Sequence, residues 1–199
     1  MPILSQTGIV NLALREIGEF RINDINEDSP PAEVARDLFD NIKRRCLQAH
    51  DWRFAMKQAE LASIDEDVLL EFSTAWQMPA DMVRLSRICE NTTMDPPLTE
   101  FSVVGRKILT STVNLFIEYV YDAPVISEWP DYFAAYMSAV LASEMAPAIK
   151  SASERERLEK LIMLRLPQAR SLDSQQQPVI IVHPSRWLSA MRGQVSWWR

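Results

Sequence analysis

The chain has 199 residues, of which 47% are hydrophobic and 24% charged, which is enough apolar material for one large domain or two small ones. Its net charge of −6 argues against sequence-independent binding to nucleic acid, because such binding depends on Lys and Arg neutralising phosphates. No run approaches the roughly 18 apolar residues of a transmembrane helix, and the start lacks the basic leader of a signal peptide, so synthesis in the cytosol is expected.

Helical spacing opens the chain. A first helix is expected over residues 5–17, with Ser5 as its N-cap and Gly18 ending it. A second is expected over residues 30–50, because a pair of prolines at its start suits the first turn of a helix. The segment after it is expected to be extended or turning, with Trp52 packed inward.

The middle of the chain changes to strand-like patterning. The short runs MVRLSRIC, FSVV, KILTS and LFIEYVY are rich in β-branched and aromatic residues, and they predict a small antiparallel β-meander over residues 82–122. Gly105 and Arg106 are expected to form a two-residue type II′ hairpin loop. The last run is apolar on both faces, which is typical of a central strand.

Helical spacing then returns. Helices are expected over residues 130–149 and 152–170, with Pro147 ending or kinking the first and Pro167 kinking or stopping the second. The predicted fold is therefore α+β and mainly α. It is a bundle of about four helices with the meander inserted between the second and third, forming a single domain over residues 1–175 with an extended arm after it.

The last 24 residues, 176–199, differ from the rest in composition. The last acid is Asp173, so residues 174–199 carry three of the 21 basic side chains and a net charge of +3, against −9 for residues 1–173. Half of the six tryptophans lie here, and the run VIIV at 179–182 has no neighbour in sequence with which to pair. Such a run is expected to join the edge of a sheet, in its own chain or in another.

A search for chemistry finds little in this sequence. His50 and His183 have no nucleophile at a suggestive spacing, and Cys46 and Cys89 are expected to be reduced core residues. There is no Gly-rich phosphate loop and no cluster with metal-ligand spacing, and the acidic run at 65–67 is expected to be a solvated turn. We therefore expect no catalysis, no cofactor and no metal.

Two other classes of function carry little weight. Trp and Arg together suit a membrane interface, but three arginines without a sustained amphipathic period make a weak anchor. The first two helices could imitate a helix-turn-helix, yet an acidic loop joins them in an acidic body. Neither membrane binding nor DNA binding is expected.

The order of segments resembles a known family. ALREIGE, then ARDLFDNIKRRCLQAHDWRFA, then AWQMPADMVRLSRI, FSVVGRKILTS, LFIEYVYDAP and PDYFAAYMSAVLASEMAPAI succeed one another as in the tail tubular protein A family. These are the head–tail adaptors, or gatekeeper proteins, of tailed bacteriophages. The resemblance covers roughly residues 3–172, and the order and spacing of the segments carry it more than any single motif.

The resemblance implies a structural protein of the virion neck or tail, assembled in the host cytoplasm. Family members form a homo-oligomeric ring, commonly of twelve copies, beneath the portal protein. The ring extends the DNA channel, through which DNA passes without specific binding, and provides a platform for the downstream tail or nozzle protein. No cofactor, catalysis or membrane is implied. The alternative function is a small acidic cytosolic interaction or regulatory protein that binds a partner through its Trp- and Arg-rich tail.

Residues 176–199 are the candidate docking arm. We expect the arm to bind the portal or a neighbouring subunit, with tryptophans as anchors, because Trp is enriched among binding hot spots. The alternative is that the arm folds back and completes the core of its own chain. The candidate partner-binding residues are Val179, Ile180, Ile181, Val182, Trp187, Arg192, Trp197, Trp198 and Arg199.

Overall fold

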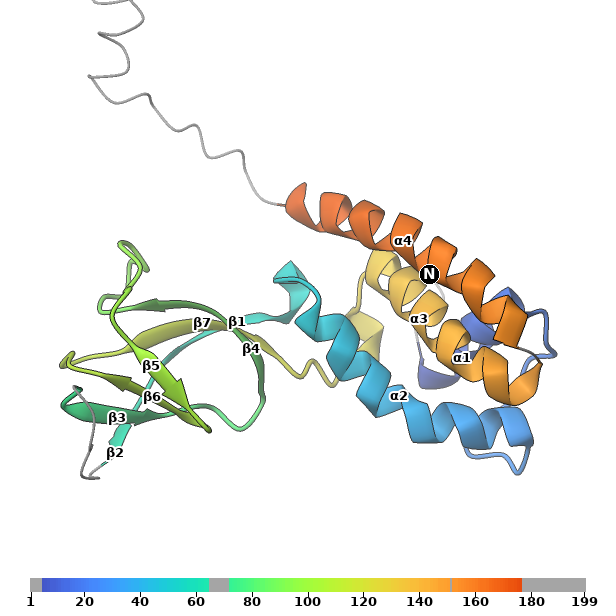
Figure 1. Ribbon diagram of the computed structural model, residues 1–199, viewed down its shortest axis with the longest axis horizontal. Helices are drawn as coiled ribbons and strands as arrows, with labels where there is room; N and C mark the ends of the chain where they lie inside the picture. The colour runs from blue at the N-terminus through green and yellow to red at the C-terminus, as the bar shows by residue number, and fades with distance from the viewer. Residues whose placement is uncertain (1–4, 65–71, 151, 177–199) are drawn as a thin grey trace, which may run out of the picture.

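The computed structural model describes residues 5–64, 72–150 and 152–176. This part of the chain forms two bodies that lie end to end along the long axis, a helical bundle and a β-domain (Figure 1). The α+β, mainly α fold predicted from the sequence is confirmed. The bundle consists of α1 (Gln6–Ile17), α2 (Pro30–Gln48), α3 (Asp131–Ile149) and α4 (Ala152–Ser174).

The two ends of α1 are capped as predicted. The Ser5 hydroxyl accepts a hydrogen bond from the backbone N–H of Gly8 at 3.0 Å. Gly18 has a φ of +75°, in the left-handed region that residues with a Cβ rarely adopt, and its N–H donates to the carbonyl of Arg15. Both caps satisfy backbone groups that a helix end leaves unpaired, so the bounds of this helix follow from local sequence.

Helix α3 is the central element of the bundle. It packs against α1, α2 and α4, and it is apolar on all sides, not on one face only. This explains why its hydrophobic pattern is so broad, since a helix covered all round needs no polar face. Pro147 lies within the last turn of α3, so the helix ends close to this proline, as the sequence predicts. Its fully buried large side chains are Phe133, Met137, Leu141 and Met145.

Helix α4 does not stop near Pro167 as one reading of the sequence expected. It continues to Ser174, because side chains on both sides of the proline are packed or bonded to the bundle. Ala169 is buried and Asp173 is fully covered, and Arg165 donates to the carbonyl of Ala135 at 3.0 Å and to the carboxylate of Glu16 at 2.7 Å. These contacts offset the one backbone hydrogen bond that the proline removes.

The β-domain is inserted between α2 and α3, as predicted, but it is larger than the meander expected over residues 82–122. The four expected strands are β4 (Met82–Cys89), β5 (Ser102–Val104), β6 (Lys107–Thr110) and β7 (Phe116–Tyr121). The sequence reading missed three more, β1 (Met56–Glu60), β2 (Ser63–Ile64) and β3 (Thr74–Gln77). Because β1 is mostly exposed and polar and β2 is very short, neither shows the alternation that predicts a strand.

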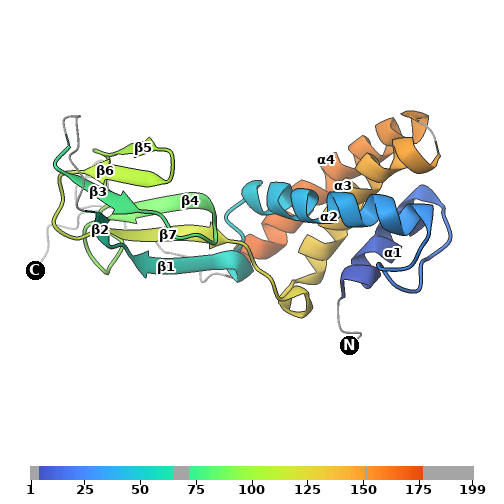
Figure 2. The ribbon, with the colours of Figure 1, turned by 90° about the horizontal axis from the view of Figure 1, so that it is seen from below.

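The strand order also differs from a simple meander. The described strands form two antiparallel sheets, one with the order β1-β7-β4 and the other with the order β2-β3-β6-β5 (Figure 2). Strand β7 is the centre of its sheet, as its apolar pattern predicted. Gly105 has a φ of +60° and Arg106 does not share it, which fits the predicted type II′ loop between β5 and β6.

Each body has its own hydrophobic core. The larger core belongs to the bundle and includes residues from Ile9 to Ala169, with Trp52 fully buried in it. The smaller core lies between the two sheets, around Trp76, Ile108 and Ile117. The cores adjoin at the junction, where Val120 of β7 belongs to the larger core and Tyr121 packs against both.

Candidate functional site

A buried carboxylate, that of Asp173 in the last turn of α4, lies where the chain passes from α2 into the β-domain. Its oxygens accept hydrogen bonds from the backbone N–H of Arg53 at 3.1 and 3.2 Å, and Oδ1 also accepts from the Tyr132 hydroxyl at 2.7 Å. His50 Nε2 lies 3.4 Å from Oδ2. The Asp173 side chain is completely covered, so it contacts protein groups and no solvent.

These contacts join four parts of the chain that are distant in sequence. Arg53 begins the 3₁₀ turn Arg53–Ala55 that leads into β1, Tyr132 lies in the first turn of α3, and His50 comes after α2. Arg170, one turn before Asp173, donates to the carbonyl of Ala49 at 2.6 Å. The end of α4 is therefore fixed to the end of α2 and to the entry of the β-domain.

Trp52 fills the space beside the carboxylate. Its indole N–H donates to the carbonyl of Cys46 at 2.8 Å, and its ring lies 5.0 Å from the His50 ring and 6.3 Å from the Tyr132 ring, measured between centroids. Burial raises the pKa of the Tyr132 hydroxyl, and the bond to Asp173 adds to this, so the phenol stays neutral and donates. Burial likewise raises the pKa of the Cys46 thiol to about 12.

A second set of contacts ties the sides of the two bodies together. The Arg84 guanidinium of β4 donates to the carbonyl of Gln48 at 3.2 Å and lies 3.5 Å from the carboxylate of Asp51. Lys43 of α2 forms an ion pair with Asp122, just after β7, at 2.8 Å. The junction thus combines these polar contacts with apolar ones, since Val120 of β7 belongs to the bundle core and Val83 of β4 packs against it.

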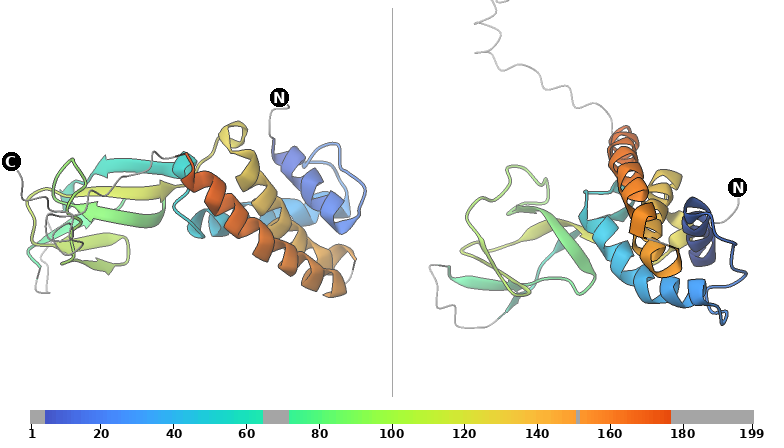
Figure 3. Two further views of the ribbon diagram at one scale, coloured as in Figure 1. Left: turned by 90° about the horizontal axis from the view of Figure 1, so that it is seen from above. Right: turned by 45° about the vertical axis from the view of Figure 1, so that its right-hand side comes forward.

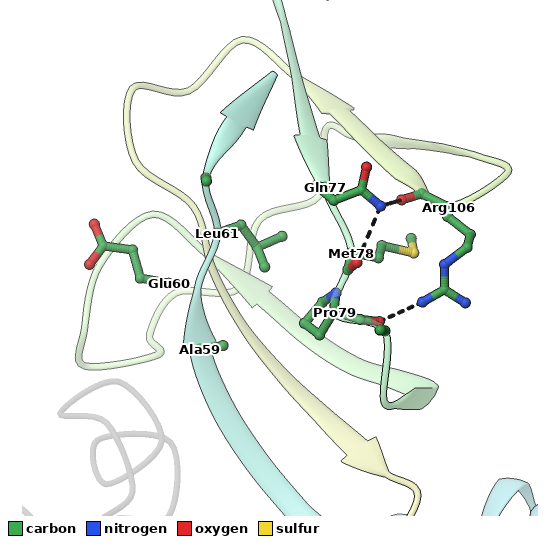
Figure 4. Close-up of a pocket in the computed structure, with 9 residues that line it drawn as sticks. Ala59, Glu60, Leu61, Gln77, Met78, Pro79 and Arg106 are labelled. Carbon is green, nitrogen blue, oxygen red and sulfur yellow. Dashed lines mark hydrogen bonds between the residues drawn. The ribbon is translucent and has the colours of Figure 1, made fainter. Parts of the chain in front are cut away.

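The β-domain contains a groove of about 440 Å³ between the ends of β1 and β3 and the β5–β6 loop (Figure 4). Leu61 and Met78 line it, whereas the Glu60 side chain points away from them. The Arg106 guanidinium donates to the Pro79 carbonyl at 2.6 Å. Because the Arg106 guanidinium is hydrogen-bonded to a backbone carbonyl, the surface of the groove is mainly apolar. It contains no acid and base placed to act together in catalysis.

Among the exposed large apolar side chains of the described residues, two pairs are adjacent in sequence, one on α4 and one on β5. On the outer face of α4, Met163 and Leu164 are 74% and 64% exposed. On the edge of the β-domain, Val103 and Val104 of β5 are about half exposed, at 48% and 51%. Contiguous exposed apolar surface marks a site of contact with another molecule more often than a single exposed residue does.

The structure leaves the predicted docking arm unplaced. All nine candidate partner-binding residues lie at 179–199, outside the described residues, as do His183 and the acidic run at 65–67. Cys46 and Cys89 are buried free cysteines, as predicted. Within the described ranges, no group of three His, Cys, Asp or Glu side chains could hold a metal ion, and no helix has the length and apolar character needed to cross a membrane.

Asp173 is the residue that sequence reasoning missed, because it was read only as the last acid before a polar linker. Its position in the sequence nevertheless indicates that it is buried. Along α4 the positions of Leu158, Ile162, Leu166 and Ala169 form one helical stripe, and Asp173 continues it one turn later. An acid on a buried stripe needs partners, which here are an N–H and a hydroxyl.

Comparison with known proteins finds no matching model of a protein family and no matching curated protein.

We predict that Asp173→Ala lowers the free energy of unfolding by about 3 kcal/mol, because it leaves the Arg53 N–H and the Tyr132 hydroxyl without an acceptor. Asp173→Asn keeps one oxygen and costs less. The control is Asp28→Ala at an exposed loop position, expected to change stability by no more than about 0.5 kcal/mol. Urea denaturation measures all three, and an Asp173→Ala loss no larger than that of the control would contradict the role of this carboxylate.

The pH dependence of stability tests the environment of His50. Burial lowers its pKa from 6.5, as do Arg170 and Arg84, against the opposing attraction of Asp173 and Asp51. Because the unfolded chain then binds more protons, stability is expected to fall as pH drops from 7.5 through 6.5. His50→Gln removes this titration, so its unfolding free energy should depend less on pH. If acidification stabilises the wild type relative to His50→Gln, the pKa of His50 is raised and not lowered.

Proposed function

We propose that this chain is a structural head–tail adaptor of a tailed bacteriophage. It assembles as a ring beneath the portal, extends the DNA channel, and supports the next tail component. The observation that carries the proposal is the order of elements: two helices, an inserted β-domain, and two more helices, in the order of the family that the sequence resembles. The proposal includes neither catalysis nor a cofactor.

The segments that carry the resemblance are the elements that build the two bodies. ALREIGE covers the end of α1 and its glycine cap, and PDYFAAYMSAVLASEMAPAI is the central helix α3 with Pro130 before it. FSVVGRKILTS is the β5–β6 hairpin, and LFIEYVYDAP contains β7. The likeness therefore lies in structural positions with defined roles, which supports a shared architecture.

A closed ring needs two different surfaces on each copy, because each subunit meets its neighbours through unlike patches. The exposed apolar face of α4 and the exposed edge at β5 belong to different bodies of this chain. Between Leu161 and Ala169 the only charged residue is Arg165, which bonds inward to Ala135 and Glu16. These two surfaces are candidates for the unlike patches of a ring.

Electrostatics also supports the proposal. A channel through which DNA slides should bind phosphates weakly, since each Lys or Arg contact adds affinity. Residues 1–173 carry a net charge of −9, which suits a surface that does not retain DNA. In the proposed assembly, the positively charged residues 174–199 contact the acidic surface of a protein and not DNA.

The junction gives the arm a fixed point of departure. Asp173 precedes the arm directly and is anchored to Arg53 and Tyr132. An arm that starts from a buried, bonded turn leaves the body at a defined place in every copy, which a ring with repeated contacts requires. In the proposed assembly, Trp187, Trp197 and Trp198 are the anchors and Arg192 and Arg199 pair with acids on the portal or a neighbouring copy.

Deletion of residues 176–199 tests this function. The truncated chain is expected to fold with a melting temperature near that of the full chain, because the described cores contain no residue after Ala169. It should no longer co-sediment with purified portal rings. A full chain with Trp197→Ala and Trp198→Ala should also bind the portal weakly, whereas the matched pair Ser185→Ala and Ser189→Ala should bind normally.

Two results would contradict the proposal in different ways. A truncated chain that unfolds as a monomer would mean that the arm completes its own fold. A full chain that ignores portal rings but gains thermal stability from a nucleotide, a metal ion or DNA would reject the adaptor function itself.

A further inference from the structure

Four of the described strands form sheet edges, and β5 is the longest of them that carries neither a charge nor a register shift. Natural sheets protect their edges with charges, bulges or short strands. β1 carries Lys57 and Glu60, β4 carries Arg84 and Arg87 together with two register shifts, and β2 has two residues. β5 has three residues, carries no charge, and pairs regularly with β6 without a register shift.

The free side of β5 offers backbone groups for another strand. Among the described strands, β5 pairs with β6 alone. Val104 lies opposite Lys107 across the two-residue loop, so these two form the hydrogen-bonded pair that closes the hairpin. Val103, opposite Ile108, is the next pair, and its N–H and C=O therefore point away from β6. An outward N–H and C=O beside half-exposed valines is the surface on which an added strand pairs.

The segment that leads into β5 has the charge to attract a basic partner. Residues 90–100 contain Glu90, Asp95 and Glu100, all exposed, and no Lys or Arg. The net charge of this segment is −3, against +3 for residues 174–199. The same segment forms a cavity of about 250 Å³ lined by Pro96, Pro97 and Leu98, a size that suits one side chain better than a small-molecule ligand.

We propose that residues 179–182 of one copy add as a fifth strand to the β5 edge of a neighbouring copy, with the arginines that come after them facing the acidic segment 90–100. This inference rests on the proposed function in one respect, that copies of the chain meet in a ring. The pairing is heterologous, because the end of one chain meets the β-domain of the next, and this is the kind of contact that closes a ring.

The place where the arm begins favours a neighbouring copy over the same chain. Asp173 holds the end of α4 beside the entry of β1, and Figures 1 and 3 place the β5–β6 hairpin on the far side of the β-domain from that end. The five Cα–Cα steps from Ser174 to Val179 span at most about 18 Å. A strand at 179–182 would have to pass around its own β-domain to reach its own β5 edge.

Disulfide trapping tests the proposal with full-length chains. One preparation carries Val103→Cys, and four others carry single cysteines in place of Val179, Ile180, Ile181 or Val182. The native Cys46 and Cys89 are buried and stay out of the reaction. Each tail variant is mixed with the Val103→Cys chain at high concentration under oxidised glutathione, and cross-linked dimers are counted on a non-reducing gel.

Strand addition predicts an alternating result. Successive residues of a strand point to opposite faces, so cross-linking with residue 103 should be confined to position 179 or 181 or both, or else to position 180 or 182 or both. Cross-linking at all four positions would indicate random collision. The proposal is overturned if none of the mixtures gives a cross-linked dimer. It is also overturned if a further variant, which carries both cysteines in one chain, forms the disulfide only within itself.

A backbone substitution provides the second test. Val103→Pro removes the outward N–H without removing a bond to β6, and it should lower the yield of a Val104→Cys cross-link to the tail about tenfold. Val103→Thr keeps the N–H and the branched shape and is the matched control, expected to preserve the yield. Equal yields from the two variants would exclude strand pairing at this edge.

Failure of this inference can be told apart from failure of the proposed function. If the full chain binds portal rings and forms oligomers but no alternating cross-links appear, the adaptor function stands and the β5 contact is wrong. If alternating cross-links appear in a chain that ignores portal rings, the strand addition stands and the adaptor function is wrong.

Discussion

A buried carboxylate, that of Asp173, fixes the end of α4 to the segment that leads from α2 into the β-domain. Asp173 accepts the first backbone N–H of the turn into the β-domain and the hydroxyl of Tyr132, with no contact to water. Burying a charge is costly unless hydrogen bonds compensate it, and here both oxygens have donors. The end of α4, the entry of the β-domain and the start of α3 are thereby held together. The position of the β-domain relative to the bundle also depends on the contacts of α2 with β4 and with the end of β7.

The division into two bodies separates different tasks. The bundle provides a rigid, mainly apolar mass around α3, and the β-domain carries an open edge at β5 and an acidic segment before it. The chain that leaves α4 has the opposite charge and a run of strand-forming residues. A ring of identical copies can use such a pair of unlike features repeatedly, once for each neighbour. In the proposed adaptor, the junction at Asp173 sets the direction in which each copy reaches the next.

Local sequence predicts much of this fold, and tertiary contacts account for the rest. The caps Ser5 and Gly18 and the Gly105 loop depend on backbone needs that are visible in a few residues, so these elements were predicted correctly. Strand β1 was missed because MKQAE is largely exposed and gains its place from pairing with β7. Helix α4 passes Pro167 because contacts at Arg165 and Asp173, far away in sequence from their partners, hold its last turns. The candidate arm was recognised from composition alone, whereas the β5 edge appears only when strand order is known.

The most direct test of the whole account is a cryo-EM map of the full chain mixed with portal rings of a tailed phage that encodes it. The account predicts a ring of this protein under the portal, with the density of residues 177–199 crossing from each copy to a neighbouring copy or to the portal. It would be contradicted by portal rings that remain bare. Density for residues 177–199 packed against the bundle of the same copy would contradict the arm while leaving the ring.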